Sequence, residues 1–397
     1  MEASASLPNI PNEIILHILL QLPMKAVIRC QCVCKQWRSL IDDSDFKLSY
    51  RGERRVIFLS LGSESQDYNW NSKFLVRSTS HDSRLQRHEL PFGEADYPLI
   101  RASDEYPVRS LCSCNGFVLL MAVRDRDIFL WNPSTRCLRK VLEFPYPEVL
   151  VILGGLCYDS CTRDYKVVLS IRPGLVFGDR FVISASLNHK EWRPVQFPFS
   201  LNYARGGLEF RNTFHWWAND IKDPHFSGSG RNKILYFDPV RDEFKILSTP
   251  ERGQNFSIVG LGVIDDCLSL ACMVNKQEKL KTTTTTLQVL IMKEYGIQES
   301  WMTAFAIQMP QLPYTSMSRF SLTFYSQKNN AQEVVFLSTM GYFLGKVYVY
   351  DRKEDELRSG LLMNFAKNDS GRRISCVSMC FYVESLACLP LQQHMIN

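Results

Sequence analysis

A repeating pair of strands along most of this chain limits what it can fold into more than any other feature. Each copy is an apolar strand, a polar turn and a second strand, and the copies occupy residues 73–90, 127–142, 181–197, 233–247, 287–304 and 346–360. The turn centres between Asn132 and Asp351 are roughly 50–57 residues apart, which is within the range of propeller repeats. The pattern therefore predicts one repeated β architecture.

A second kind of hairpin, often opened by glycine, lies between these copies. It occupies residues 114–123, 154–171, 206–218, 260–274, 319–337 and 375–390. Two hairpins per period give four strands, which is the content of one propeller blade. We expect a β-propeller of roughly six blades, closed into a ring by pairing of 73–90 with 375–390. The alternative fold, two β-sandwiches, predicts no period along the whole chain.

The first forty residues have a different, helical pattern. Apolar side chains recur there at helical spacing, at Ile14, Ile15, Ile18, Leu19 and Leu22. Pro11 suits a first helical turn and Pro23 ends that helix, and two further apolar sets predict about three short helices up to Ile41. Three helices this short form a marginal core. Their remaining apolar surface packs either on a partner or on the second region of the chain.

Composition excludes several classes of protein. The net charge of +5 comes from 46 Lys+Arg and 41 Asp+Glu, and the basic residues are scattered, which favours a solvated surface over a nucleic-acid groove. An apolar run of about 18 residues is missing, so we expect no membrane span, and the N-terminus lacks the pattern of a secretory signal. The 13 cysteines include no C-x-x-C pair. They predict free, mostly buried thiols in a reducing compartment and no zinc site.

The sequence offers no familiar catalytic motif, so we predict a protein without enzymatic activity, cofactor or metal. The aromatic run "HWW" at 215–217 either stacks on a sugar or base or is buried between blades, and burial is the favoured interpretation. The glycine pair in "GLGVID" at 260–265 is interpreted as a backbone turn. Carboxylates in the turns are predicted to bind nearby backbone rather than to act as acids; these are Asp159, Asp164, Asp238 and Asp242.

Three short motifs follow one another in the helical segment. They are Ile-Pro-x-Glu at 10–13, Leu-Pro-x-Lys at 22–25 and Val-x-Lys-x-Trp-Arg-x-Leu-Ile at 33–41. With this spacing the segment resembles an F-box, with Ile10 in place of the family's Leu and Cys30 where a large apolar residue is common. The resemblance implies docking on a Skp-type adaptor, which bridges to a cullin. The adaptor-binding residues implied by position are Ile10, Pro11, Ile14, Ile15, Leu19, Leu22, Pro23, Val27, Val33 and Trp37.

The second region contains "LCSCNGFVLL", "IFLWNPSTR", "GLCYDSCTRDYKVV", "GLEFRNTFHWWA" and "ILYFDPVRDEFKIL". These stretches resemble the F-box-associated, kelch-related domain of plant F-box proteins. The expected fold is mainly β: a short all-α N-terminal F-box of about three helices over residues 7–50, then a kelch-like β-propeller of roughly six blades over 55–390. Some members of this group are S-locus F-box proteins, which recognise pistil ribonucleases.

The two resemblances together imply the substrate-recognition subunit of an SCF-type (Skp-cullin-F-box) ubiquitin ligase. The F-box would hold the Skp adaptor, and the propeller would bind a protein target for ubiquitination and proteasomal degradation, a pistil ribonuclease if the chain is of the S-locus type. The expected location is cytoplasmic, nuclear or both. The alternatives are a propeller that binds a protein or carbohydrate outside ligase complexes, and a propeller enzyme with polar groups in its central channel.

Overall fold

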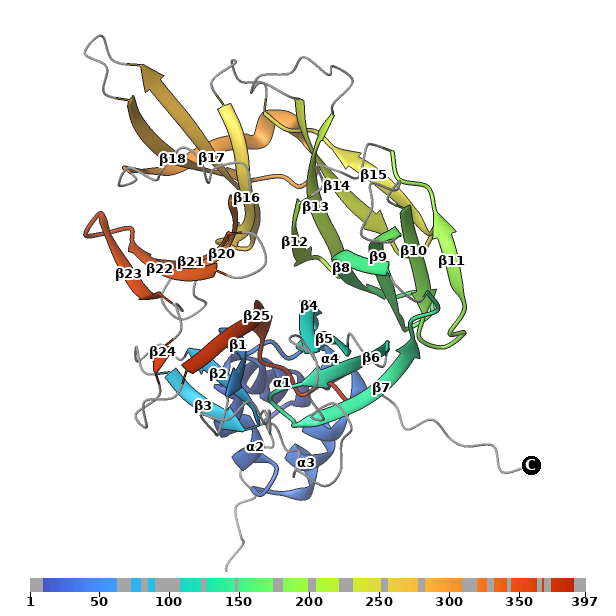
Figure 1. Cartoon of the computed structure of the whole chain (residues 1–397). Coiled ribbons are helices and arrows are strands. Elements are labelled where there is room, and N and C mark those ends of the chain that lie inside the picture. The colour runs from blue at the N-terminus through green and yellow to red at the C-terminus, as the bar shows by residue number, and fades with distance from the viewer. Residues whose placement is uncertain are drawn as a thin grey trace, which may run out of the picture.

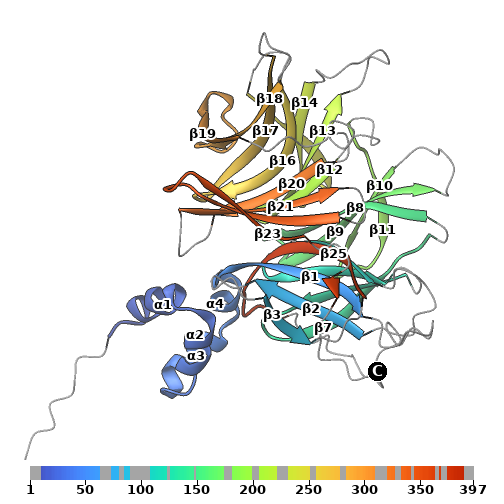
Figure 2. The same cartoon turned by 60° about the vertical axis from the view of Figure 1, so that its left-hand side comes forward.

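The computed structural model describes residues 10–62, 73–79, 85–89, 108–122, 126–146, 149–173, 181–198, 205–220, 231–250, 256–277, 283–308, 320–326, 332–340, 344–362, 366–367 and 373–388. Within these ranges the chain has two parts: short helices at the N-terminal end, and sheets arranged around a common centre (Figure 1). Helices α1 to α3 project to one side of the ring, whereas α4 lies beside it (Figure 2).

The helical part contains four helices, one more than the sequence predicted. They are α1 (Asn12–Gln21), α2 (Met24–Cys30), α3 (Lys35–Asp42) and α4 (Ser44–Ser49). Pro11 and Pro23 stand immediately before α1 and α2, in agreement with the predicted helix boundaries. The fourth helix begins where the carboxylate of Asp43 accepts hydrogen bonds from the backbone N–H groups of Asp45 (2.8 Å) and Phe46 (3.1 Å). None of the described helices is long and apolar enough to span a bilayer.

Three of the sheets have four antiparallel strands in chain order. The first contains β4 (Val108–Cys114), β5 (Phe117–Ala122), β6 (Asp127–Asn132) and β7 (Cys137–Glu143). The second contains β8 (Val149–Asp159), β9 (Asp164–Pro173), β10 (Phe181–Ser186) and β11 (Trp192–Val195). The third contains β12 (Arg205–Phe210), β13 (Thr213–Asp220), β14 (Arg231–Asp238) and β15 (Glu243–Leu247). The hairpins predicted over these residues are confirmed.

A fourth sheet has eight strands and consists of two such four-stranded units. The first unit contains β16 (Phe256–Ile264), β17 (Cys267–Gln277), β18 (Thr283–Met292) and β19 (Trp301–Gln308), with the short 3-10 helix η3 (Gln298–Ser300) before β19. The second contains β20 (Phe320–Ser326), β21 (Glu333–Met340), β22 (Leu344–Asp351) and β23 (Glu356–Leu362). Strands β16 and β20 pair in parallel and join the two units.

The glycines of "GLGVID" make this parallel pairing possible. Gly260 and Gly262 lie within β16, opposite Leu322 and Phe324 of β20. A Cβ atom on Gly262 would overlap the ring of Phe324, and one on Gly260 would overlap Leu322. The prediction of a backbone turn here is therefore wrong. Glycine is needed because two backbones approach each other closely.

The remaining sheet brings the two ends of the chain together. It contains β1 (Arg54–Gly62), β2 (Lys73–Thr79), β3 (Leu85–Glu89), β24 (Ala366–Lys367) and β25 (Arg373–Val383), in the order β24-β25-β1-β2-β3. The predicted hairpin 73–90 and the C-terminal segment do share a sheet, but β1 lies between them. The described part of 375–390 is one strand followed by an extended segment, so the hairpin predicted there is wrong.

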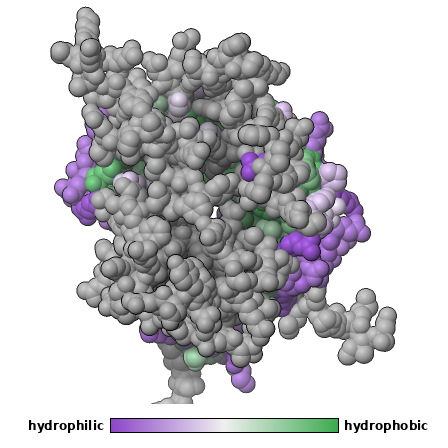
Figure 3. Space-filling view, viewed as in Figure 1, coloured by the Kyte–Doolittle hydropathy of each residue, from purple (hydrophilic) through white to green (hydrophobic). Residues whose placement is uncertain are grey.

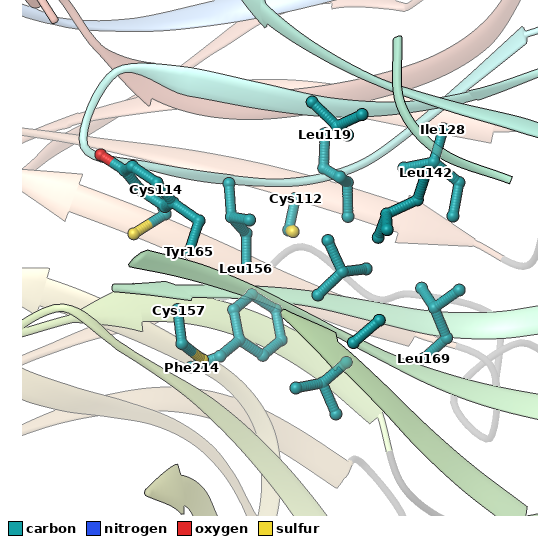
Figure 4. Close-up of a cluster of buried hydrophobic side chains, with 14 of the residues drawn as sticks. Cys112, Cys114, Leu119, Ile128, Leu142, Leu156, Cys157, Tyr165, Leu169 and Phe214 are labelled. Atoms are coloured by element: carbon teal, nitrogen blue, oxygen red, sulfur yellow. The ribbon is translucent and has the colours of Figure 1, made fainter. Parts of the chain in front are cut away.

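The strands nearest the common centre are β4, β8, β12, β16, β20 and β25, and successive members from β25 through β4 to β20 contact one another (Figure 1). The core lies between neighbouring sheets. In the cluster of Figure 4, Cys112 comes from β4, Leu156 and Cys157 from β8, Leu169 from β9 and Phe214 from β13. Burial in this cluster raises the pKa of the Cys157 thiol to about 12.

Side chains are described for twelve of the 13 cysteines, and no disulfide joins these twelve to one another. Only four of them are fully buried, namely Cys112, Cys114, Cys157 and Cys272. The prediction that most thiols are buried is therefore wrong for these twelve cysteines. Cysteines of the helical part account for two of the exposed thiols, Cys32 and Cys34.

Candidate functional site

Helix α1 carries two adjoining apolar stripes, and only one of them is covered. Ile15 and Leu19 are buried, with 4% and 0% of their surface exposed. Ile14 and Ile18 occupy the adjoining positions and remain 51% and 44% exposed. Residues four apart lie one above the other on a helix, so Ile14 and Ile18 form one exposed stripe.

The buried side of α1 belongs to the core of the helical part. This core also contains Met24, Val27, Ile41, Phe46, Tyr50 and, from the C-terminal segment, Leu386. The Tyr50 hydroxyl donates a hydrogen bond to the backbone oxygen of Leu22 at 2.9 Å, which ties the chain after α4 to the end of α1. The helices therefore form one packed unit with a defined inside and outside.

The structure divides the ten residues predicted to bind the adaptor into three groups. Five are exposed: Ile10, Pro11, Ile14, Pro23 and Val33. Two are half-buried, Leu22 and Trp37, and three are buried, Ile15, Leu19 and Val27. The exposed residues are available to a partner, whereas the buried ones hold the helices together.

Two exposed aliphatic residues were missing from the predicted set. Ile18 and Ile28 are each 44% exposed. Ile18 carried a readable signal, since it lies four residues after Ile14 on the same helix. Ile28 follows the buried Val27, and nothing in the sequence marks which of the two faces outward. We call Ile10, Ile14, Ile18, Ile28 and Val33 the exposed aliphatic set.

Charged residues accompany the exposed aliphatic set on α2 and α3. Lys25, Arg29 and Lys35 are exposed. Asp42 at the end of α3 is 3.7 Å from the Arg38 guanidinium and 3.3 Å from the Lys47 ammonium. Exposed pairs of this kind contribute little to stability. The exposed aliphatic set differs from the described outer surface of the ring, which is largely hydrophilic with small apolar areas in the view of Figure 3.

A hollow of about 360 Å³ lies between the end of β1 and the ends of several central strands. Its lining includes Arg54 of β1, Glu209 of β12 and Tyr325 of β20. Burial raises the pKa of the Glu209 carboxyl, which accepts a hydrogen bond from the backbone N–H of Asn212 at 2.8 Å. The Arg54 guanidinium stacks on the Tyr325 ring, 5.0 Å from its centroid.

The described lining of this hollow contains one serine and the carboxylates of Glu209 and Asp266. Its one serine, Ser113, donates its hydroxyl hydrogen bond to the backbone oxygen of Phe381 rather than to a base. Among the described residues, no group of three or more His, Cys, Asp or Glu side chains is placed to hold a metal ion. A serine activated by a neighbouring base is therefore not assembled in the described lining.

The aromatic run 215–217 is buried, as the favoured interpretation predicted. His215, Trp216 and Trp217 are 0%, 1% and 4% exposed, so none presents a face to a sugar or base. The Nε2 atom of His215 lies 2.8 Å from the Tyr295 hydroxyl. Burial lowers the pKa of His215 from its ordinary 6.5 to about 3, so the imidazole is neutral.

The turn carboxylates bind local backbone or neighbouring strands. Asp159 accepts hydrogen bonds from the backbone N–H groups two and three residues later, and Asp238 does the same. Asp164 accepts from the Ser186 hydroxyl, and Asp242 accepts from the Ser184 hydroxyl at 3.0 Å. The prediction that these carboxylates bind nearby backbone is confirmed for Asp159 and Asp238. It is confirmed also for Asp164, which accepts the backbone N–H of Tyr165 at 2.8 Å. Asp242 instead accepts from a side chain of a neighbouring sheet.

Comparison with known proteins identifies both parts of the chain. The F-box associated beta propeller domain matches residues 71–389, and the F-box domain matches residues 7–49. The chain belongs to the F-box associated beta propeller family. A domain of each kind in one chain supports a general role as substrate adaptor of an SCF-type complex, and the F-box implies a Skp-type adaptor as partner.

Curated proteins that resemble this chain are named as F-box proteins. The chain is similar to the F-box/kelch-repeat protein At3g23880 of Arabidopsis thaliana, with 29% identity over 74% of this chain and 78% of that protein. It is also similar to the F-box protein CPR1 of Arabidopsis thaliana, with 27% identity over 76% of this chain and 74% of that protein. Among solved structures, TolB from Acinetobacter baumannii matches 83% of this chain and 66% of its own, at 11% identity and a TM-score of 0.44.

Proposed function

We propose that this protein is the substrate receptor of an SCF-type ubiquitin ligase, and that the exposed aliphatic set docks on the Skp-type adaptor. The observation that carries the proposal is the division of α1 into a covered and an uncovered apolar side. The covered side already builds the helical core, so the stripe of Ile14 and Ile18 has no structural task within the described chain. An aliphatic stripe left exposed in this way fits a partner surface.

In this role the chain carries out no bond chemistry itself. The adaptor links the F-box to a cullin, and the propeller holds a protein target, a pistil ribonuclease if the chain is of the S-locus type. Ubiquitin transfer is then accelerated because target lysines are kept close to the ubiquitin-carrying enzyme. We propose the boundaries 7–50 for the F-box and 55–390 for the propeller, and a cytoplasmic or nuclear location.

The test is capture of the full chain by a purified Skp-type adaptor. Replacing Ile14 and Val33 together by Ala removes two exposed anchors, each worth about 1–2 kcal/mol of binding free energy if they are central to the interface. We expect the adaptor to bind the double variant at least about tenfold more weakly, with an unchanged unfolding temperature.

The matched control changes two exposed aliphatic residues of the propeller, Val240 and Ile246, to Ala. This control should bind the adaptor like the native chain. Undiminished binding of the Ile14 and Val33 variant would overturn the proposed surface. The alternative is a propeller binding module outside ligase complexes. It would be favoured if the native chain bound its target, did not bind the adaptor and had no effect on the lifetime of the target.

A further inference from the structure

One short C-terminal segment is buried in both parts of the molecule. After β25 ends at Val383, residues Glu384–Cys388 continue without regular secondary structure. Leu386 is buried in the core of the helices, together with Phe46. The next residue, Ala387, is buried in a core of the propeller. The segment therefore inserts consecutive side chains into two different cores.

A buried asparagine of the propeller holds this segment in place. Asn132, which is fully buried, donates hydrogen bonds from its Nδ2 atom to the backbone oxygens of Ser385 (3.1 Å) and Ala387 (2.8 Å) and lies 3.2 Å from the Ser385 hydroxyl. Its Oδ1 atom accepts the backbone N–H of Ser134 at 2.9 Å. Both ends of the amide are thus engaged, which fixes the path of the segment on the propeller.

The chain between α4 and β1 is bound to the same segment. The backbone N–H of Gly52 donates to the oxygen of Glu384 at 2.8 Å, and the N–H of Glu384 donates to the oxygen of Glu53 at 2.9 Å. The Arg55 guanidinium lies 2.6 Å from the Glu384 carboxylate. The Arg51 guanidinium donates to Asn115 Oδ1, in the β4–β5 turn, at 2.5 Å. We call residues 50–55 and 384–388, with Asn115, Gly116 and Asn132, the joint.

We propose that the joint holds the F-box at one fixed orientation to the propeller, and so decides which lysines come within reach of the ubiquitin-carrying enzyme. This inference rests on the proposed function for its consequence, but the rigidity is a property of the chain alone. Two domains connected by a single linker move relative to each other by default. Here a second segment crosses between the domains and is buried in both, so Asn132, Gly116 and Leu386 act as positioning residues.

Gly116 offers the sharpest way to loosen the joint. Its φ is +83°, and a Cβ atom there would overlap the side chain of Ser385. Gly116→Ala must therefore displace the C-terminal segment. Gly296 has a similar φ of +93° with nothing within 4 Å of its would-be Cβ, so Gly296→Ala carries the same backbone strain without touching the joint. The two variants differ in contact with the joint and not in backbone conformation.

The first measurement is the distance between spin labels on the F-box and the propeller of the full chain, by double electron–electron resonance. The labels are carried by non-natural residues in place of the exposed His17 in α1 and Lys353 in the β22–β23 turn, because cysteine labels would react with the exposed native thiols. We expect one narrow distance distribution for the native chain and for Gly296→Ala, and a broadened one for Gly116→Ala. A broad distribution in the native chain, or a narrow one in Gly116→Ala, would overturn the proposal that the joint fixes the orientation of the F-box.

A second pair of variants covers the case in which Gly116→Ala does not fold. Leu386→Ala removes an apolar anchor from the helical core at the joint, and Met24→Ala removes one from the same core away from it. Both should lower stability, but only Leu386→Ala should broaden the distance distribution. Equal broadening in both variants would assign the effect to the helical core and overturn the role of the segment.

The second measurement follows self-ubiquitination of propeller lysines in a complex reconstituted with a Skp-type adaptor and a cullin, with the modified lysines identified by mass spectrometry. We expect the native chain to be modified at a restricted set of lysines, and Gly116→Ala to be modified at additional ones with unchanged adaptor affinity. The same restricted set of modified lysines in both chains would contradict the proposal that the joint decides which lysines are reached. Failure of the native chain to bind the adaptor would remove the proposed function, while the distance measurement would still decide on the rigidity.

Discussion

The helices of the F-box and the strands of the propeller differ in how completely they bury their apolar residues. Every residue of β5 is buried, because this strand lies inside a sheet that packs on neighbouring sheets. In α1, the apolar Ile14 and Ile18 are exposed while Ile15 and Leu19 are buried. A ring of sheets covers both faces of its inner strands, whereas a unit of four short helices covers one side of each. Exposed aliphatic residues therefore indicate function in the helices more than in the ring.

The largest expected effect separates the two sides of α1. Leu19→Ala should cost about 2–5 kcal/mol of folding free energy of the helical part, because the side chain is fully buried. Ile14→Ala, half-exposed on the same helix, should leave stability almost unchanged and weaken adaptor binding. Chemical unfolding of both variants, followed by adaptor titration, checks this. Similar stability losses in both would remove the distinction between core and docking side chains.

The next effect concerns the buried polar residue His215 of the propeller. The unfolded imidazole binds a proton below about pH 6.5, whereas the folded one resists protonation down to about pH 3. The unfolded state thus binds more protons in this window, so the stability of the protein falls as pH drops from about 6.5 to 3, by up to about 4 kcal/mol from this residue.

Replacing His215 by Gln should flatten the stability profile across this pH window in equilibrium unfolding. The buried carboxyls Glu209 and Glu384, whose pKa values burial raises, are present in both proteins and cancel in the difference. The exposed His189→Gln variant serves as control and should keep the native profile. A native-like profile for His215→Gln would show that this residue is not the source of the acid sensitivity.

A smaller loss is expected where the two units of the eight-stranded sheet meet. Gly262→Ala places a methyl group against Phe324 and should cost about 1–3 kcal/mol by overpacking. Ser257→Ala, at an exposed position of the same strand, should have no measurable effect on thermal unfolding. Full stability of Gly262→Ala would contradict the close parallel pairing of β16 with β20.

The smallest effect concerns a single turn of the propeller. Asp159→Ala removes the acceptor of two backbone hydrogen bonds, at 2.8 Å and 3.3 Å, and should cost about 1 kcal/mol. Asp159→Asn keeps the Oδ1 acceptor and should restore most of this loss in denaturant titrations. If Asn and Ala are equally destabilising, the charge and not the hydrogen bonds stabilises the turn.

Most of the propeller hairpins could be predicted because their signals are local. An apolar strand followed by Asn or Asp at the turn predicts a hairpin, and the side chains of Asn132, Asp238 and Asp351 do accept backbone hydrogen bonds in their turns. The sequence also placed a candidate docking surface on the first helices, at the level of the segment. It could not sort Ile14 from Ile15, because a helix that is apolar on both sides carries no sign of which side is covered.

By itself, the sequence determined the two kinds of architecture, because hydrophobic periodicity and turn chemistry act over a few residues. Tertiary structure alone decided the contacts between distant segments: the place of β1 beside β25, the passage of Gly260 and Gly262 beside β20, and the insertion of Leu386 into the helical core. These depend on which surfaces meet after the ring has closed. No local pattern around a glycine or a leucine records the identity of a neighbour that lies far away along the chain.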